Sequence, residues 1–446
     1  MGEPEANNHR QLGLFSATAA VIATMIGAGI FGATGGFAHQ LGTDANVLLV
    51  WLFCGLLALT GALSLGELGG MMPLAGGSYA YNRHIYGPTA GYLTGVLSSL
   101  LAFVGAAAYV TLLLGHHVQQ LVPGATPPVT ATIAVVVFSV VHCAGLREGT
   151  WINNAFTVFK VGVIVTFIVA GFSVSAKAVP IEEVSNPGIC SAPFAAAMIS
   201  ASFAYLGWET TTWIGSEVKN PQRNLPLSLI VGTVFVTILY LLINMVFLRA
   251  LPAAGMIDEK GEGINGIGQH VANILFSGNI SLWFNLMIIV VLISTTSTII
   301  MVGGRILFAM AEARQLPLWA GKLNRNSVPA NALLIQALAT LVFIWIASSH
   351  QGADDILIFI GLPTSVIMAA AVLGVIILRS REPDCDRPFR VPLYPLPPLL
   401  FIALAIWMIV STIQYKWQAS IASVTLIAVV WLLKPVLAQK NPPSTD

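Results

Sequence analysis

The chain has 446 residues, of which 56% are hydrophobic and only 9% are charged, and its formal net charge is +1. Soluble domains carry about 25% charged residues, and here the deficit extends along the whole chain, which excludes a soluble protein or a soluble domain with one anchor. The sequence has no basic excess or basic cluster, so binding of nucleic acid is not expected.

Apolar stretches long enough to cross a bilayer recur from one end of the chain to the other. A spanning helix takes about 20 apolar residues. Twelve such spans are predicted, at residues 12–37, 46–70, 88–114, 127–145, 152–175, 192–215, 227–250, 278–309, 330–348, 354–378, 397–415 and 417–434. We therefore expect an all-α polytopic membrane protein with 12 transmembrane helices in contact with the lipid bilayer.

The positions of the 20 basic residues predict the orientation of these spans. When the N-terminus is placed in the cytoplasm and the spans alternate, most basic residues fall on the inner side, as the positive-inside rule requires. We therefore expect a cell-membrane protein with both tails, residues 1–11 and 436–446, in the cytoplasm. The N-terminal tail is polar, so a cleavable signal peptide is not expected.

The first and sixth spans each contain residues that interrupt a helix. The stretch MIGAGIFGATGG at residues 25–36 has five glycines, and residues 207–212 combine a glycine, an acid and three threonines. The second break comes five spans after the first, which predicts a repeat of five helices with the second copy inverted in the membrane. The copies would be residues 12–175 and 192–378, followed by two further helices at residues 396–435.

A helix broken inside a membrane is expected where its backbone lines a cavity. Unwinding at Gly27–Gly29 would expose the N-terminus of a half-helix, which suits a carboxylate, and free carbonyls nearby would suit an ammonium. The alternative is that the glycines only allow close helix packing. The residues predicted to bind a zwitterionic substrate at the breaks are Thr24, Met25, Ile26, Gly27, Ala28, Gly29, Tyr205 and Gly207.

Several motifs resemble those of the amino acid–polyamine–organocation superfamily. They are IGAGIF at 26–31, FAYLGWE at 203–209, SEVKNPQRNLP at 216–226 and RPFRVPLYPLPP at 387–398, and residues 66–88 resemble that family's re-entrant loop. FAYLGW followed by EVKNPQRNLP is most similar to the L-type amino acid transporters and their bacterial relatives. The resemblance implies a fold of the leucine-transporter type with a 5+5 inverted repeat, alternating access and amino acid substrates.

When the other basic residues are assigned to the inner or outer side, Lys160 is the one left within a span, which makes it a candidate for function. Its ammonium must be paired, reach an interface or lose its proton, because removal from water disfavours the charged form. The resemblance implies that this lysine occupies the cation position of sodium-coupled relatives and joins the broken first helix to the eighth span. Its expected partners in coupling or proton binding are Ser294, Thr295 and Thr298. A static ammonium that never titrates is the open alternative.

Glu209 directly follows the predicted break in the sixth span. Its carboxylate could take up a proton, attract a cationic substrate or stabilise the break by hydrogen bonding, and the sequence leaves these roles open. The resemblance extends to the superfamily's arginine/agmatine antiporters, which also have an acid at the position that matches Glu209. However, Ala106 and Ile299 stand where those proteins place an amide side chain and a tryptophan, so a site for a guanidinium is not expected.

Other residues are candidates for gating or for packing. The resemblance implies that Phe203 covers the substrate from outside as a thin gate, with ordinary packing as the alternative, and that Trp208 flanks the pocket for the substrate's side chain. Glu67 lies at the cytoplasmic end of the second span, and we expect it to form a structural or gating ion pair with Arg83. The lone His142 is expected to be a packed residue.

These features predict a secondary transporter that moves amino acids, either as a proton-coupled symporter or as an exchanger. A polyamine or organic-cation transporter of the same fold is the alternative, although it would need more carboxylates than Glu209. The four ionisable residues weighed within the membrane, Lys160, Glu209, Glu67 and His142, include no HExxH, GxSxG or paired aspartates, and the sequence shows no channel filter and no nucleotide-binding loop. Enzyme activity, a cofactor and a metal are therefore not expected.

The cysteines are scattered along the chain and predict neither a disulfide framework nor a metal site. They are Cys54, Cys143, Cys190 and Cys385. The predicted outer loop at residues 115–128 contains no cysteine. We therefore expect no disulfide-linked heavy chain of the kind that accompanies animal L-type transporters, and either a monomer or a homodimer.

Overall fold

The structure is a computed structural model, and it describes residues 10–27, 29–174, 188–189, 191–257, 263–264, 266–276, 280–348, 353–415 and 417–437. Within these ranges the fold is helical, and the extended pairings are three isolated bridges. The helices are α2 (Leu14–Met25), α3 (Gly29–Leu41), α4 (Asp44–Met71), α5 (Ser78–Tyr86), α6 (Pro88–Leu97), α7 (Ala106–Leu121), α8 (Pro127–Ala144), α9 (Leu146–Ser173), α10 (Ala192–Ala204), α11 (Thr210–Trp213), α12 (Pro221–Ala250), α13 (Ile267–Leu275), α14 (Ile280–Glu312), α15 (Ala330–Ser348), α16 (Ala353–Arg381), α17 (Leu396–Tyr415) and α18 (Trp417–Leu437).

Local sequence explains where several of these helices begin. The Thr43 hydroxyl accepts the Asn46 N–H at 3.3 Å before α4, and the Ser191 hydroxyl accepts the Phe194 N–H at 3.3 Å before α10. Such side-chain caps satisfy amides that have no partner within the helix. Pro221 begins α12, where its fixed φ and missing N–H cause no loss.

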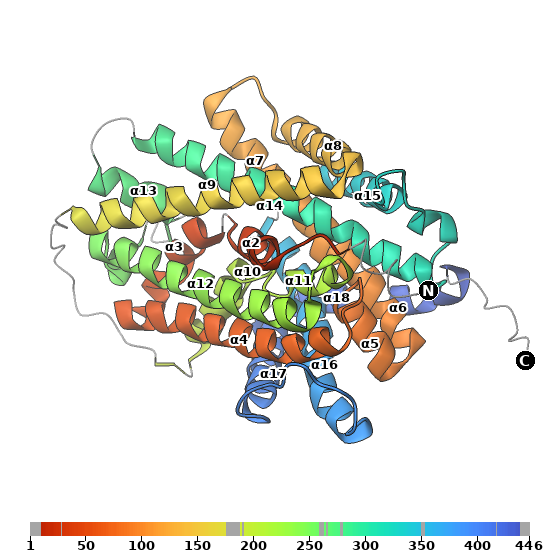
Figure 1. Cartoon of the computed structure of the whole chain (residues 1–446). Helices are drawn as coiled ribbons and strands as arrows, with labels where there is room; N and C mark the ends of the chain where they lie inside the picture. Colours follow the sequence, from red (N-terminus) through yellow and green to blue (C-terminus); the bar gives the residue numbers. More distant parts are fainter. Residues whose placement is uncertain are drawn as a thin grey trace, which may run out of the picture.

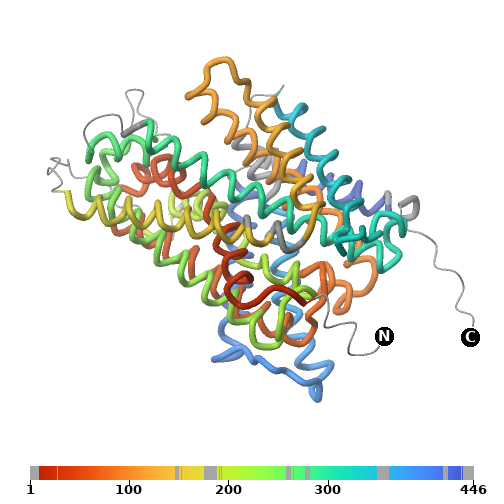
Figure 2. Tube along the Cα trace, turned by 45° about the horizontal axis from the view of Figure 1, so that its top comes forward, coloured from red at the N-terminus to blue at the C-terminus, as the bar shows by residue number. Residues whose placement is uncertain are grey.

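The interrupted helices lie between two layers of long helices. In Figures 1 and 2, α9 and α14 run beside each other across one side of the molecule, and α4 and α12 run along the other. Helix α2 contacts α9, α12 and α14, and α10 contacts α3, α4 and α17. Helices α7, α8 and α15 pack on the outer side of α14. The core is therefore centred on the broken segments.

The number of spans agrees with the prediction only in part. In the described ranges, nine helices are long and apolar enough to cross a membrane, and the bent pair α2 and α3 makes ten if it is one span. The predicted sixth and twelfth spans fall on shorter apolar helices, Pro193–Ala204 and Ser420–Leu432. A polytopic helical membrane protein is thus confirmed, whereas the twelve spans, the inverted repeat and the domain boundaries stay predictions.

Candidate functional site

Two helices are interrupted near the centre of the fold. Helix α2 ends at Met25 and α3 begins at Gly29, with the two axes bent by 42°. Helix α10 ends at Ala204, and the chain forms turns until α11 begins at Thr210. Both breaks occur where the glycines and polar residues of the sequence predict them. Ala28, one of the predicted binding residues, lies outside the described residues.

The two breaks lie against each other. A Cβ built on Gly29 would be 3.2 Å from the Cβ of Ala204. Gly207 has a φ of +100°, and a Cβ built there would be 2.5 Å from the Cγ2 of Thr24. Only glycine fits this left-handed, crowded position. By contrast, a Cβ built on Gly27 would meet no atom of the described residues within 4 Å, so the backbone at Gly27 faces open space in this part of the structure.

Lys160 reaches the end of α2 from α9. Its side chain is fully buried, and its Nζ donates to the carbonyl oxygens of Ala23 (2.8 Å) and Ile26 (2.7 Å) and to the Thr295 Oγ1 (3.3 Å). These three acceptors match the three hydrogens of an ammonium. Among the described side chains, no carboxylate forms an ion pair with Lys160. The lysine therefore joins α2, α9 and α14.

The hydroxyl residues of α14 that were predicted to surround Lys160 differ in their contacts. The Thr295 hydroxyl lies 2.9 Å from the Ile26 carbonyl oxygen and shares the cluster with Lys160. Thr298 donates to the Oδ1 of Asn153 instead. Ser294 is fully buried, and its hydroxyl has no hydrogen-bond partner in the described part of the chain. Only Thr295 thus contacts the lysine directly.

A tyrosine that the sequence did not single out connects the two breaks. The Tyr240 hydroxyl of α12 lies 2.7 Å from the Met25 carbonyl oxygen and 2.8 Å from the Ala204 carbonyl oxygen. A hydroxyl has one hydrogen, so it donates to one of these acceptors at a time. The ring packs edge-on against Tyr205 and Trp51, with centroid separations of 5.1 Å and 5.3 Å. Tyr240 lies in an apolar stretch of the sequence, so its neighbours do not predict that it connects the two breaks.

Glu209 is buried directly after the second break. Its polar neighbours are the backbone at Gly207 and Glu209 and the side chain of Trp213, and its Oε2 has no hydrogen-bond partner in the described structure. No described basic side chain forms an ion pair with it. Thr210 and Thr212 donate to the carbonyl oxygens of Gly207 and Glu209, which satisfies the unwound backbone.

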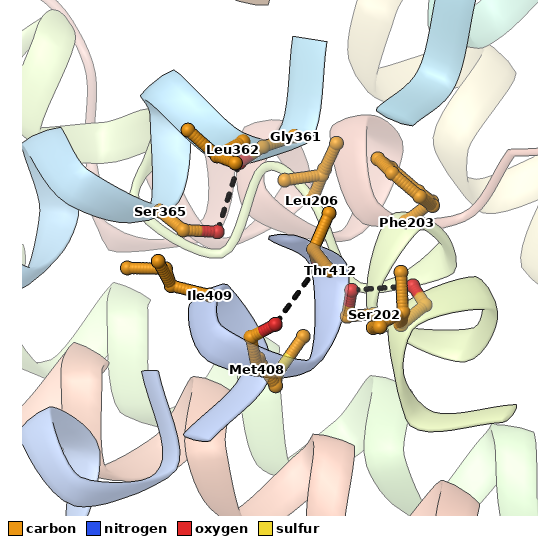
Figure 3. A pocket seen from close by; sticks show the side chains of 10 residues that line it. Ser202, Phe203, Leu206, Gly361, Leu362, Ser365, Met408, Ile409 and Thr412 are labelled. Atoms are coloured by element: carbon orange, nitrogen blue, oxygen red, sulfur yellow. Dashed lines mark hydrogen bonds between the residues drawn. The ribbon is translucent and has the colours of Figure 1, made fainter. Parts of the chain in front are cut away.

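A small cavity of about 30 Å³ lies between α10, α16 and α17, beside the second break (Figure 3). It is lined by Ile199, Ser202, Phe203, Leu206, Gly361, Leu362, Ser365, Met408, Ile409 and Thr412. The hydroxyls of Ser202, Ser365 and Thr412 donate to carbonyl oxygens of Ile199, Gly361 and Met408, each on its own helix. Because their hydrogens are used, these hydroxyls offer the cavity only acceptor lone pairs.

The two aromatic residues predicted for the substrate pocket lie apart. The Phe203 ring lines the cavity and lies against Gly361, where a Cβ would be 2.7 Å from the ring. Trp208 lies outside the lining and packs 5.8 Å from the ring of Phe401 and against Gly61. A gating role for Phe203 and a pocket role for Trp208 remain predictions.

The expected ion pair between Glu67 and Arg83 is wrong. Glu67 is buried, and its carboxylate accepts from Arg379 at 2.6 Å and 2.9 Å and from the Val391 N–H at 2.7 Å. Arg387 adds a contact at 3.4 Å, whereas Arg83 is exposed and forms no ion pair with a described residue. The end of α16 and the segment after it lie against α4, which brings in partners more than 300 positions away.

Other polar residues are held in the interior away from the breaks. The Nε2 of His142 lies 3.0 Å from the Ser297 Oγ, in agreement with a packed histidine. Arg305 of α14 is buried and pairs with Glu217 at 2.9 Å. No group of three or more metal-binding side chains occurs among the described residues. Cys190 lies outside them, and the other cysteines are free.

Comparison with known proteins gives a consistent result along nearly the whole chain. A family model described as amino acid permease matches residues 12–433. The serine/threonine exchanger SteT of Bacillus subtilis is 30% identical over 91% of both chains. The mouse large neutral amino acids transporter small subunit 2 is 26% identical over 96% of this chain and 82% of its own. The human b(0,+)-type amino acid transporter 1 is 25% identical over 93% of this chain and 86% of its own.

Proposed function

The chain belongs to the amino acid permease family, and from this premise we propose that it is a secondary transporter that exchanges amino acids across the cell membrane by alternating access. The observation that carries the proposal is the meeting of two interrupted helices beside an open space at Gly27. Such paired breaks are typical of the substrate site of a transporter.

The substrate's charged ends would bind to backbone at the breaks. The N-terminus of α3 carries amides without helical partners and a partial positive charge, which suits the α-carboxylate. The α-ammonium would be received by carbonyl oxygens near Thr24 and Tyr205, because the carbonyl of Gly207 already accepts the Thr210 hydroxyl. The carbonyls of Met25 and Ala204 are already approached by Tyr240, and that of Ile26 by Lys160, so these positions would shape the site rather than bind the ligand.

The proposed substrates are small neutral amino acids. The cavity beside Leu206 has a volume of about 30 Å³ and three acceptor hydroxyls, which suits a small side chain that donates a hydrogen bond. The name of the Bacillus subtilis relative, a serine/threonine exchanger, points to the same class. A polyamine is less well supported, because it would need more carboxylates in the site than the buried Glu209 provides.

Exchange is favoured because Lys160 has all three hydrogens bound to described acceptors, which fits a fixed structural cation. Proton-coupled symport is the second candidate. Its support is that Lys160 is fully buried without a carboxylate partner among the described residues, a position where the charged form is disfavoured. In that mechanism Lys160 would bind and release the coupled proton.

Uptake of radiolabelled serine into proteoliposomes separates the two mechanisms. The wild type and Lys160→Met would be measured with and without internal serine, and with and without an inward proton gradient. Uptake that needs internal serine and ignores the gradient supports exchange. Uptake that follows the gradient in the wild type, but not in the variant, supports symport. Absence of flux for every amino acid tested would contradict the proposed substrate class.

The membrane arrangement is part of the same proposal. Both termini would be cytoplasmic, in accordance with the distribution of basic residues. The mouse relative is named as a small subunit. For this chain we propose a transporter that works without a disulfide-linked heavy chain, as a monomer or homodimer, because the predicted outer loop at residues 115–128 has no cysteine.

A further inference from the structure

A chain of buried hydrogen bonds connects α3 with α4 and α12. The Trp51 Nε1–H donates to the Thr34 Oγ1 at 3.0 Å, and the Thr34 hydroxyl donates to the Asn244 Oδ1 at 2.5 Å. The Asn244 amide then donates through Nδ2 to the Tyr240 carbonyl oxygen at 2.8 Å. The side chains of Trp51, Thr34 and Asn244 are all fully buried. Bulk water therefore does not reach these partners.

The direction of every bond in this chain is determined. An indole nitrogen can only donate, so Thr34 must accept from Trp51 and use its single hydrogen toward Asn244. Asn244 must then present its carbonyl oxygen to Thr34. Its NH₂ group therefore points to the Tyr240 carbonyl oxygen in its own helix, α12. No rotation of the threonine or of the amide preserves all three bonds. The network accordingly specifies one position of α3 relative to α4 and α12.

The same residues extend to both helix breaks. The Trp51 carbonyl oxygen accepts the Tyr205 hydroxyl at 2.8 Å, which fixes the first residue after α10. The hydroxyl of Tyr240 approaches the ends of α2 and α10. Thr34 lies in α3 five residues after Gly29, the first residue of that helix and the one that lies against Ala204. The network thus connects α3 with the end of α2 and with the end of α10.

We propose that Thr34 and Asn244 are positioning residues for substrate binding, because they hold the amide-bearing start of α3 against the second break. This inference rests on the proposed function. Neither residue needs to touch the substrate. An apolar pair would fill the same volume, but it would not select one orientation of α3, and it would leave the Trp51 N–H without a partner.

Kinetics of serine uptake test the proposal with Thr34→Val, which keeps the shape of the side chain and removes its hydroxyl. We expect KM to rise about tenfold while kcat per folded transporter changes less than about threefold, because misplaced amides weaken binding of the carboxylate. Thr34→Ser restores the hydroxyl and should return KM to near the wild-type value. Asn244→Leu should raise KM similarly, and combining it with Thr34→Val should add little, since both variants break one network.

Thr111→Val is the matched control. The Thr111 side chain is also fully buried, but its hydroxyl donates only to carbonyl oxygens of its own helix, α7. This variant should leave KM unchanged. The proposal is overturned if Thr34→Val lowers the amount of folded transporter but leaves KM unchanged. It is also overturned if Thr34→Ser raises KM as much as Thr34→Val does, or if Thr111→Val raises KM as much as Thr34→Val does.

A measurement that does not depend on transport keeps this inference separate from the proposed function. Spin labels on Gln40 of α3 and Val169 of α9, both exposed, report the position of α3. We expect their distance distribution to broaden in Thr34→Val and to remain narrow in Thr34→Ser and Thr111→Val. An unchanged distribution in Thr34→Val would contradict positioning even if transport is confirmed. A broadened distribution without flux in the wild type would contradict only the proposed function.

Discussion

The Nζ of Lys160 lies 2.7 Å from the carbonyl oxygen of Ile26, the residue directly after half-helix α2. The last carbonyls of a helix lack partners within it and carry partial negative charge, so a cation there supplies both a donor and a favourable field. Thr295 adds a hydroxyl from α14 to the same carbonyl, at 2.9 Å. Lys160 therefore caps a helix whose last carbonyl oxygens would otherwise lack partners in the protein interior.

Replacing Lys160 with methionine should abolish most transport. The substitution keeps much of the length of the side chain but removes three donors, so the end of α2 loses its cation and its link to α9. We expect initial serine uptake to fall at least about tenfold, a loss of roughly 1.4 kcal/mol or more in transition-state stabilisation. Lys434→Met is the control, since Lys434 binds Thr89 on α6, away from the breaks. Wild-type rates in Lys160→Met would contradict the capping role.

Replacing Tyr240 with phenylalanine should separate hydrogen bonding from packing. Phenylalanine keeps the ring contacts with Trp51 and Tyr205, whereas the carbonyls of Met25 and Ala204 lose their shared donor. A typical hydrogen bond contributes about 1 kcal/mol net, so we expect a small loss of thermal stability and a KM raised several-fold. Thermal unfolding in detergent and uptake kinetics measure the two effects. Unchanged KM would show that the hydroxyl does not shape the site.

Alanine substitutions at two glycines should have opposite structural consequences. At Gly207 the φ of +100° and the approach of Thr24 make a methyl group strained, at a cost of about 1–3 kcal/mol. We expect Gly207→Ala to lose uptake and folded yield together. At Gly27 a methyl group meets only open space, so Gly27→Ala should fold normally. A raised KM in that variant would place the substrate beside Gly27, and an unchanged KM would place it elsewhere.

Removing the charge of Glu67 should lower the stability of the protein more than it changes the kinetics of transport. The carboxylate is buried against Arg379 and Arg387, and breaking such a pair costs about 3–5 kcal/mol because a buried charge is left without its partner. Glu67→Gln should therefore lower the unfolding midpoint clearly. The exposed pair of His84 and Glu382 provides the control, because Glu382→Gln should cost at most about 1 kcal/mol. Equal shifts in the two variants would contradict this difference.

The helix breaks were predictable because their causes are local. Gly27, between α2 and α3, and Gly207, between α10 and α11, disfavour a continuous helix at those positions in the chain. Burial of Lys160 and its contact with Thr295 could also be expected, since a lysine in an apolar helix needs acceptors and the hydroxyl-rich segment of α14 is polar. In each case the signal lies in the type of residue.

The partners of other residues were not predictable from the sequence. Glu67 was assigned to Arg83, sixteen positions away, but pairs with Arg379, separated from it by 312 positions. Thr34 and Asn244 are separated by 210 positions, and each lies in a helix with no polar pattern to mark it. Tyr240 appears in the sequence as one more aromatic residue of an apolar span. Only the packing of α3, α4 and α12 brings these groups together.

The sequence by itself determined that this is a polytopic helical membrane protein of the amino acid permease family with two helices that break, because composition and glycine content act locally. Tertiary structure decided which polar groups meet. A buried donor needs an acceptor but carries no information on which distant helix provides it, so the choice depends on how the helices pack. The fold thus assigns Tyr240 to both broken ends, Asn244 to Thr34, and Arg379 to Glu67.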